Sequence, residues 1–349
     1  MGLIPLTHGF ATLNGTKRYF ARKKVCDQKL RTTDGFYCLP IAVGTHLGEF
    51  SDEDSELYIE ALTRAVDLGI NFIDTAINYR GMRSEKDVGQ ALRLLIESGL
   101  VNRDQLIIST KAGQIFGDIH LDLRPLDYLE QVLIKRGILN RADVNIVGNH
   151  RHTLEPSFYK HSFEISRKNL GLGTIDIHYI HNPEISMNVL GRQEFYKRLG
   201  KLIEFYESKA EQGFLRYYGI ATWWGLVSDE GSPWHISLAD ISKVVKSVAG
   251  NDNHFRFVQM PLSKSNNTAR EKVTQTIMGK KYSAIQAATE LELYVTISSP
   301  LDQGHALSCD LGSVVELLDY VINTDGVLAA MVGSKKKEHV EENFRAIIR

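Results

Sequence analysis

Eight short apolar runs, each followed by a helical pattern, constrain the fold of this chain more than any other feature. Most of the runs are rich in Ile, Val, Tyr or Phe and do not alternate with polar residues, which is typical of strands covered on both faces. We expect strands at Ile41–Thr45, Asn71–Asp74, Leu106–Thr110, Thr174–Ile180, Leu215–Ala221, Phe255–Met260, Leu293–Ser298 and Val327–Val332.

The stretches between these runs carry the apolar spacing of amphipathic helices. Ser51 and Ser84 are candidate N-caps, and Gly69 is a candidate C-cap. Strands that alternate with helices imply a parallel sheet with right-handed crossovers. We expect helices at Ser51–Leu68, Ser84–Glu97, Pro156–Leu170, Phe195–Gln212, Leu238–Val248, Tyr282–Leu291, Gly312–Ile322 and Lys336–Ile348.

Eight such units form either a closed barrel or a doubly wound sheet, and the pattern alone leaves both open. No G-x-G-x-x-G motif follows the first run, which weakens the case for a doubly wound dinucleotide-binding fold. α/β barrels of this length commonly form one domain. We therefore predict the α/β class, with a (β/α)₈ TIM barrel as a single domain over residues 1–349.

Three segments are additional to the eight strand–helix units of a minimal barrel. Residues 1–39 precede the first unit and contain a predicted hairpin with Asp34-Gly35 at its turn, which we expect to plug the N-terminal mouth. Residues 113–154 form a long excursion with a predicted helix at Pro125–Arg136, and residues 222–237 form an aromatic loop. Both loops follow the carboxyl ends of strands, where barrel enzymes carry their sites.

Composition excludes several classes of protein. The net charge of −1 gives no broad electrostatic case for nucleic acid or an anionic membrane. No window reaches the roughly 18 apolar residues of a membrane-spanning helix, and the first residues lack the apolar core of a signal peptide. The three cysteines form no C-x-x-C pair. We expect a cytoplasmic protein, with homo-oligomer formation left open.

Four residues with reactive side chains fall at or just after the ends of successive predicted strands. Asp74 ends one strand and Tyr79 follows it in a loop, while Lys111 and His181 lie at the ends of the next two strands. Because the carboxyl ends of parallel strands meet at one face of a barrel, these four side chains should converge.

This set suits the reduction of a carbonyl group. Hydride addition leaves an alkoxide that a general acid must protonate. The ordinary pKa of Tyr is about 10, and a buried ammonium beside Tyr79 is expected to lower it. Lys111 is the expected ammonium, Asp74 would hold it in place, and His181 would orient the carbonyl oxygen.

The motifs around these residues resemble those of the aldo-keto reductase family, over about Ile41 to Phe344. INFIDTAINYRGMRSEKDVGQAL is similar to the family's strand-2 signature, and ISTKAG and YIHNPE resemble the segments that supply its catalytic Lys and His. The resemblance implies that Tyr79 is the acid, that Lys111 and Asp74 tune it, and that His181 orients the substrate.

The same resemblance implies an NADP(H) site. Ala221, Thr222 and Ser298 depart from the family, which usually has Ser, Asn and an aromatic there, so the nicotinamide end is altered. The run of lysines at the last helix favours NADP(H) over NAD(H). The implied cofactor contacts are Gly44, Thr45, Thr222, Gln259, Ser299, Leu301, Gly304, Gly333, Ser334, Lys335, His339, Glu342 and Asn343.

The loops supply candidate contacts for a small carbonyl substrate, namely His46, Phe116, Trp223, Trp224 and Trp234. No third ligand follows His150 and His152 at a recognised spacing, so we expect no metal. Two alternatives to a reductase remain. One is a lyase that forms a Schiff base through Lys111, and the other is a non-catalytic NADP(H)-binding subunit.

Overall fold

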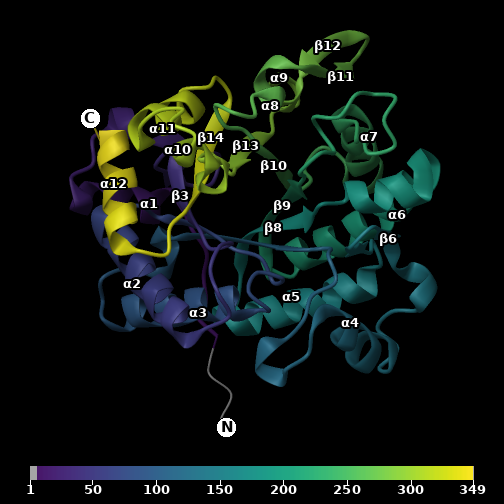
Figure 1. Ribbon diagram of the computed structural model, residues 1–349, viewed down its shortest axis with the longest axis horizontal. Coiled ribbons are helices and arrows are strands. Elements are labelled where there is room, and N and C mark those ends of the chain that lie inside the picture. Colours follow the sequence, from purple (N-terminus) through teal and green to yellow (C-terminus); the bar gives the residue numbers. More distant parts are fainter. Residues whose placement is uncertain (1–5, 349) are drawn as a thin grey trace.

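The computed structural model describes residues 6–348, and eight parallel strands in this range close into a barrel (Figure 1). The order around the barrel follows the chain, and the last strand pairs with the first. The prediction of a closed barrel is therefore confirmed, and the doubly wound alternative is wrong. The barrel strands are β3 (Ile41–Gly44), β4 (Phe72–Asp74), β5 (Ile107–Ala112), β8 (Ile175–His181), β9 (Leu215–Ala221), β10 (Phe255–Pro261), β13 (Tyr294–Ser298) and β14 (Val327–Gly333).

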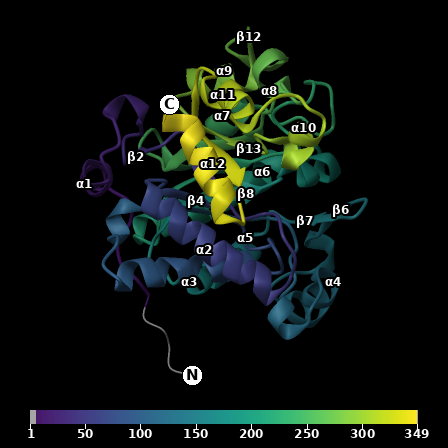
Figure 2. The ribbon, with the colours of Figure 1, turned by 60° about the vertical axis from the view of Figure 1, so that its left-hand side comes forward.

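A helix follows each barrel strand and packs on the outside of the barrel (Figures 1 and 2). Parallel strands buried on both faces require such a cover. Neighbouring helices contact one another as well, for example α2 with α3 and α12 with α2. These helices are α2 (Asp52–Leu68), α3 (Arg83–Glu97), α5 (Pro156–Leu170), α6 (Glu184–Glu211), α7 (Leu238–Ala249), α9 (Ala284–Glu290), α11 (Val314–Ile322) and α12 (Lys337–Ile348).

Two of the three predicted helix caps are confirmed. The Ser51 hydroxyl accepts the N–H three residues later and starts α2, and Gly69 ends this helix with a φ of 122°. Ser84 is not a cap, which corrects the prediction. Its hydroxyl donates to the carbonyl of Thr45 at 2.8 Å, and α3 starts after Met82 instead.

Two predicted helix starts are also wrong. The helix expected from Phe195 begins at Glu184, because the chain continues past a kink at Gly191, where φ is 70°. The helix expected from Tyr282 begins at Ala284, because Tyr282 belongs to a hairpin strand.

The N-terminal hairpin is present and closes one mouth of the barrel. Its strands are β1 (Arg31–Thr32) and β2 (Tyr37–Cys38). Between them, the fully buried ring of Phe36 stacks on Phe257 and meets the edge of Phe72, each at 6.2 Å between centroids. The sequence did not predict the helix α1 (Leu13–Lys23) and the short turn η1 (Asp27–Lys29) that precede this hairpin.

The loops at the opposite mouth are long and contain some regular secondary structure. Residues 113–154 include the predicted helix as α4 (Pro125–Tyr128) and η4 (Leu129–Ile134), and residues 222–237 run as turns and bends. Two hairpins in this region were not predicted, β6 (Asn145–Val147) with β7 (His150–His152), and β11 (Val273–Ile277) with β12 (Lys280–Ser283). The remaining short elements are η2 (Arg103–Gln105), η3 (Ile119–Leu121), η5 (Arg141–Asp143), α8 (Thr268–Glu271), η6 (Asp302–Gly304) and α10 (His305–Ser308).

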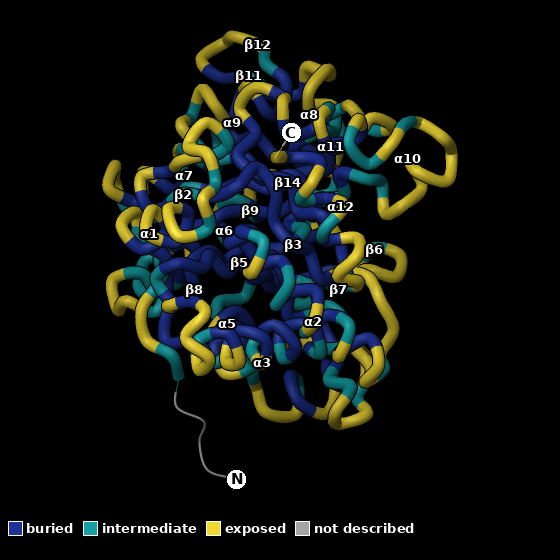
Figure 3. Tube along the Cα trace, turned by 90° about the vertical axis from the view of Figure 1, so that its left-hand side faces the viewer, coloured by how far each residue is buried: buried dark blue, intermediate teal, exposed yellow. Residues whose placement is uncertain are grey.

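The buried residues gather in the barrel and beneath its helices, while the exposed residues lie mostly on outer helix faces and loops (Figure 3). One apolar cluster fills the barrel interior and includes Phe72, Ile107 and Phe257. The larger cluster lies between the strands and the surrounding helices. Within residues 6–348, no helix is long and apolar enough to cross a membrane.

Candidate active site

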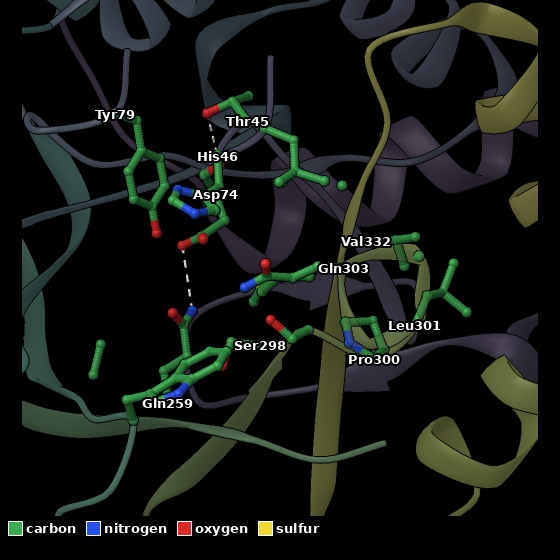
Figure 4. A pocket seen from close by; sticks show the side chains of 18 of the residues that line it. Thr45, His46, Asp74, Tyr79, Gln259, Ser298, Pro300, Leu301, Gln303 and Val332 are labelled. Carbon is green, nitrogen blue, oxygen red and sulfur yellow. Dashed lines mark hydrogen bonds between the residues drawn. The ribbon is translucent and has the colours of Figure 1, made fainter. Parts of the chain in front are cut away.

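A cavity of about 780 Å³ opens at the carboxyl ends of the barrel strands. Its wall includes Tyr79 and His181 at the first half of the barrel and Gly333 and Asn343 near the last strand and helix. Figure 4 shows Tyr79 and Leu301 on opposite sides of this space. The cavity therefore lies where the sequence predicts the site.

Asp74, Lys111 and Tyr79 form one hydrogen-bonded group at the floor of the cavity. The Lys111 Nζ atom donates to Asp74 Oδ2 at 2.6 Å, to the Thr75 carbonyl at 2.8 Å and to the Tyr79 hydroxyl at 3.3 Å. Lys111 is fully buried and lies behind the cavity wall, whereas Asp74 and Tyr79 face the cavity. Their convergence follows from β4 and β5 being adjacent parallel strands.

Burial and charge act against each other in this group. Burial alone would lower the pKa of Lys111, but the nearby Asp74 carboxylate and Tyr79 oxygen outweigh it and raise this pKa. Burial raises the pKa of Tyr79 more than the Lys111 ammonium lowers it. Lys111 therefore lowers the pKa of Tyr79 as expected, but desolvation of the phenol is the larger effect, so the net shift is upward. Tyr79 is a neutral phenol at neutral pH.

His181 and His46 flank the Tyr79 ring. The centroid of His181, at the end of β8, lies 5.9 Å from that of Tyr79, and the centroid of His46 lies 4.6 Å away. Burial and then the Lys111 ammonium hold the pKa of His181 well below its usual value. The same two causes lower the pKa of His46. Both imidazoles are therefore neutral at pH 7.

The centre of the cavity carries a polar face. Gln259 on β10 donates from Nε2 to Asp74 Oδ1 at 3.3 Å, and Figure 4 shows its amide directed at that carboxylate. The Thr222 hydroxyl lines the cavity and is buried without a hydrogen-bond partner in the described chain. Ala221 and Ser298 also line the cavity, so the altered positions face the same space.

Most of the predicted site residues contribute to the cavity wall. Besides Asp74, Tyr79 and His181, the wall contains Gly44, Thr45, His46, Thr222, Trp223, Trp224, Gln259, Ser299, Leu301, Gly304, Gly333, His339, Glu342 and Asn343.

Four predicted contacts lie elsewhere. Phe116 is buried against Tyr128 and Phe158 in the core, which corrects its assignment to the substrate. Trp234 lies behind Trp224, with 5.5 Å between centroids. Ser334 is buried and accepts the side-chain N–H of Asn343 at 2.8 Å, and Lys335 forms an ion pair at the rim.

Several polar residues of the wall were not predicted as contacts. They are Asn78, Gln114, Asn182 and Gln303, together with His150, which we had considered only as a metal ligand. Asn78 and Asn182 directly adjoin Tyr79 and His181, so neighbourhood in the sequence is the signal that would have found them. Within residues 6–348, no three His, Cys, Asp or Glu side chains are grouped to hold a metal.

Glu184 does not line the cavity itself but holds two residues of its wall, and it was not predicted from the sequence. Its Oε1 atom accepts the backbone N–H groups of Trp223 at 2.6 Å and Trp224 at 3.0 Å. Burial raises the pKa of Glu184 to about 7. This carboxylate lies three residues after His181, so it ties the His181 segment to the aromatic loop.

Comparison with known proteins places this geometry in a family. The model of the Aldo/keto reductase family matches residues 40–276. Over 300 residues the chain is 22% identical to the uncharacterized oxidoreductase YqkF of Bacillus subtilis, covering 82% of this chain and 81% of that protein.

Solved structures share the same barrel. The holo form of the aldo-keto reductase AKR11C1 from Bacillus halodurans has a TM-score of 0.60 at 18% identity, covering 91% of this chain and 90% of that chain. An aldo/keto reductase from Klebsiella pneumoniae in complex with NADP and acetate has a TM-score of 0.59 at 17% identity, covering 92% and 90%. Because the family model matches more than half of its length, this chain belongs to the aldo/keto reductase family and is an oxidoreductase.

Proposed function

We propose that this chain is an NADP(H)-dependent oxidoreductase that interconverts the carbonyl and alcohol forms of an aldehyde, ketone or sugar. The observation that carries the proposal is the buried Lys111 ammonium, 2.6 Å from Asp74 and 3.3 Å from the hydroxyl of Tyr79 at the cavity floor. A pure binding site has no need of an ammonium beside a neutral phenol.

The cavity suits a nicotinamide dinucleotide. Its volume of about 780 Å³ lies within the range of about 300–1,000 Å³ found for small-molecule sites. The unpartnered hydroxyl of Thr222 and the amide of Gln259 are available to the nicotinamide carboxamide. The Klebsiella structure with NADP in a barrel of the same fold supports this cofactor. When bound, NADP(H) supplies or accepts the hydride.

The side chains at the cavity floor supply the proton that the carbonyl oxygen takes up on reduction. Tyr79 donates its hydroxyl proton to the carbonyl oxygen, and Lys111 stabilises the phenolate that remains. Asp74 holds Lys111 in the charged form, and neutral His181 donates a hydrogen bond that orients the substrate oxygen. General acid catalysis of this kind contributes roughly 10²–10⁴-fold to the rate. Trp223 and Trp224 limit the access of water from the loop side.

Ala221 and Ser298 reduce the contacts of the nicotinamide end. Ala221 offers no polar side chain, and Ser298 offers no ring face for stacking. Thr222 and Gln259 therefore carry more of the positioning, and Gln259 shares its amide with Asp74.

Replacing Tyr79 with Phe tests the proposal. We expect kcat to fall by at least about 100-fold, while the Kd for NADPH, followed by Trp fluorescence, stays within a few-fold. Tyr37→Phe removes the same atom at the opposite mouth of the barrel and is the matched control. Retained turnover in Tyr79→Phe would refute the role of Tyr79, and a wild-type chain that binds no NADPH would refute the cofactor.

Two further experiments distinguish the reductase from the two alternatives. A non-catalytic subunit would bind NADPH but turn over none of a panel of aldehydes, ketones and sugars. A lyase would form an imine, so borohydride with substrate would label Lys111. The raised pKa and the full burial of Lys111 oppose this nucleophilic role, because an imine requires the neutral amine.

A further inference from the structure

A lysine at the far end of the cavity is already paired with a carboxylate. Lys335 lies between β14 and α12, and its Nζ atom contacts both carboxylate oxygens of Asp54 at 2.8 Å. Asp54 belongs to the first turn of α2, and Figure 2 shows α12 lying across α2. The pair therefore joins α2 to the segment that precedes α12, beside the cavity.

Asp54 is held in place by the fold. Its side chain is 8% exposed, whereas that of Lys335 is 34% exposed. The backbone N–H of Glu49 donates to its Oδ2 atom at 2.6 Å. Leu47, from the same loop, lines the cavity beside Gly333. Asp54 thus lies directly behind the wall where the adenosine end of a dinucleotide would rest.

The positive charge of the lysine run is largely cancelled by α2. Lys335 is paired with Asp54, and Lys337 lies 3.5 Å from Glu60. Lys336 is exposed, and it alone of these three lysines has no ion pair within residues 6–348. The run therefore presents about one net positive charge, although its sequence suggests three.

This balance bears on the choice between two dinucleotides. NADPH carries a 2′-phosphate with nearly two negative charges at neutral pH, whereas NADH carries a hydroxyl at the same atom. A phosphate gains from a net positive site and is repelled by a nearby carboxylate. A ribose hydroxyl, in contrast, carries no charge, so the charge balance of this site affects it much less.

We propose that Asp54 is a specificity-determining residue that lowers the preference of this chain for NADPH, so that the chain also uses NADH. This inference rests on the proposed function. Asp54 acts by neutralising the charge of Lys335, which a 2′-phosphate would otherwise meet.

The test compares the Kd values of NADPH and NADH by quenching of Trp fluorescence, at one low ionic strength. We expect wild-type protein to bind the two within about tenfold of each other, and Asp54→Asn to shift the ratio toward NADPH by about tenfold, as for one charge at a partly exposed site. Lys335→Gln should shift it toward NADH. Asp52→Asn is the matched control, because it removes the same charge from the same first turn at an exposed position paired with Arg83.

The ratio is measured on one preparation, so partial misfolding cancels out. If Asp54→Asn does not fold, the test relies on the ratio of Kd values in wild-type protein and in Lys335→Gln, because the Lys335 side chain is partly exposed and its replacement should be tolerated. An unchanged ratio in both variants would overturn the inference. So would a shift of Asp54→Asn toward NADH, or a wild-type preference for NADPH above about 100-fold. Failure of wild-type protein to bind either dinucleotide would instead refute the proposed function, and the inference with it.

Discussion

Replacing Lys111 with Met removes one charge from a buried ion pair and leaves the other without its partner. The Asp74 side chain is 6% exposed, so water cannot fully replace the ammonium. Breaking a buried pair in this way costs about 3–5 kcal/mol. Asp74 keeps hydrogen bonds from Ser109 at 2.6 Å and Gln259 at 3.3 Å, so we expect a cost near the lower end, about 3 kcal/mol.

Urea unfolding followed by circular dichroism measures this cost. The exposed Lys201 on α6 provides the control, and Lys201→Met should change stability by less than about 0.5 kcal/mol. Combining Lys111→Met with Asp74→Asn removes both charges, so we expect the double variant to lose about 1–3 kcal/mol less than the sum of the single variants. We also expect turnover to fall by roughly 10²–10⁴-fold in Lys111→Met.

Two results would refute this reasoning. A loss of less than about 1 kcal/mol in Lys111→Met would show that Asp74 does not need its partner in the folded state. Strict additivity in the double variant would show that the two side chains do not stabilise each other.

Three further outcomes are expected. Phe36→Ala should cost about 3–5 kcal/mol by emptying the plug of the N-terminal mouth, as measured by urea unfolding; a loss below about 1 kcal/mol would contradict the plug. Burial lowers the pKa of His152 and of His178 to about 3, whereas unfolded histidine titrates near 6.5. The unfolded chain therefore binds more protons in this range, and stability should fall as the pH is lowered from about 6.5 to 3, by up to about 1.4 kcal/mol per pH unit for each histidine. His152→Gln should flatten this slope in urea unfolding at several pH values, and an unchanged slope would contradict it. Trp224→Ala should raise KM for the carbonyl substrate about tenfold with the Kd for NADPH unchanged; an equal loss in both would place Trp224 at the cofactor.

The strands of this fold are predictable because strands buried on both faces have a local sequence pattern, a continuous apolar run. Runs such as Leu215–Ala221 are mostly apolar without alternation, which is typical of a strand covered on both faces. The convergence of Asp74, Lys111 and His181 is predictable for a related reason, since all three lie at strand ends and parallel pairing aligns those ends.

The errors occur where distant contacts overrule local signals. Ser84 has the composition of a cap, but its hydroxyl is used by Thr45, which lies 39 positions away. Gly191 has the conformation of a helix stop, yet helical turns lie on both sides of it. The sign of the pKa shift of Tyr79 depends on how deeply the phenol is buried, and no sequence pattern reports that depth.

The two lysine–aspartate pairs beside the cavity differ in how far their lysines are exposed to solvent. In the Lys111–Asp74 pair both side chains are nearly inaccessible, at 0% and 6%, so the lysine cannot leave its carboxylate without a large desolvation cost. In the Lys335–Asp54 pair the lysine is 34% exposed and water screens its charge, but the carboxylate is only 8% exposed and depends on its lysine much as Asp74 does. The first pair is therefore closed to solvent on both sides beside Tyr79, whereas the second keeps a partly exposed ammonium, and on our proposal its charge balance sets the preference between the two dinucleotides.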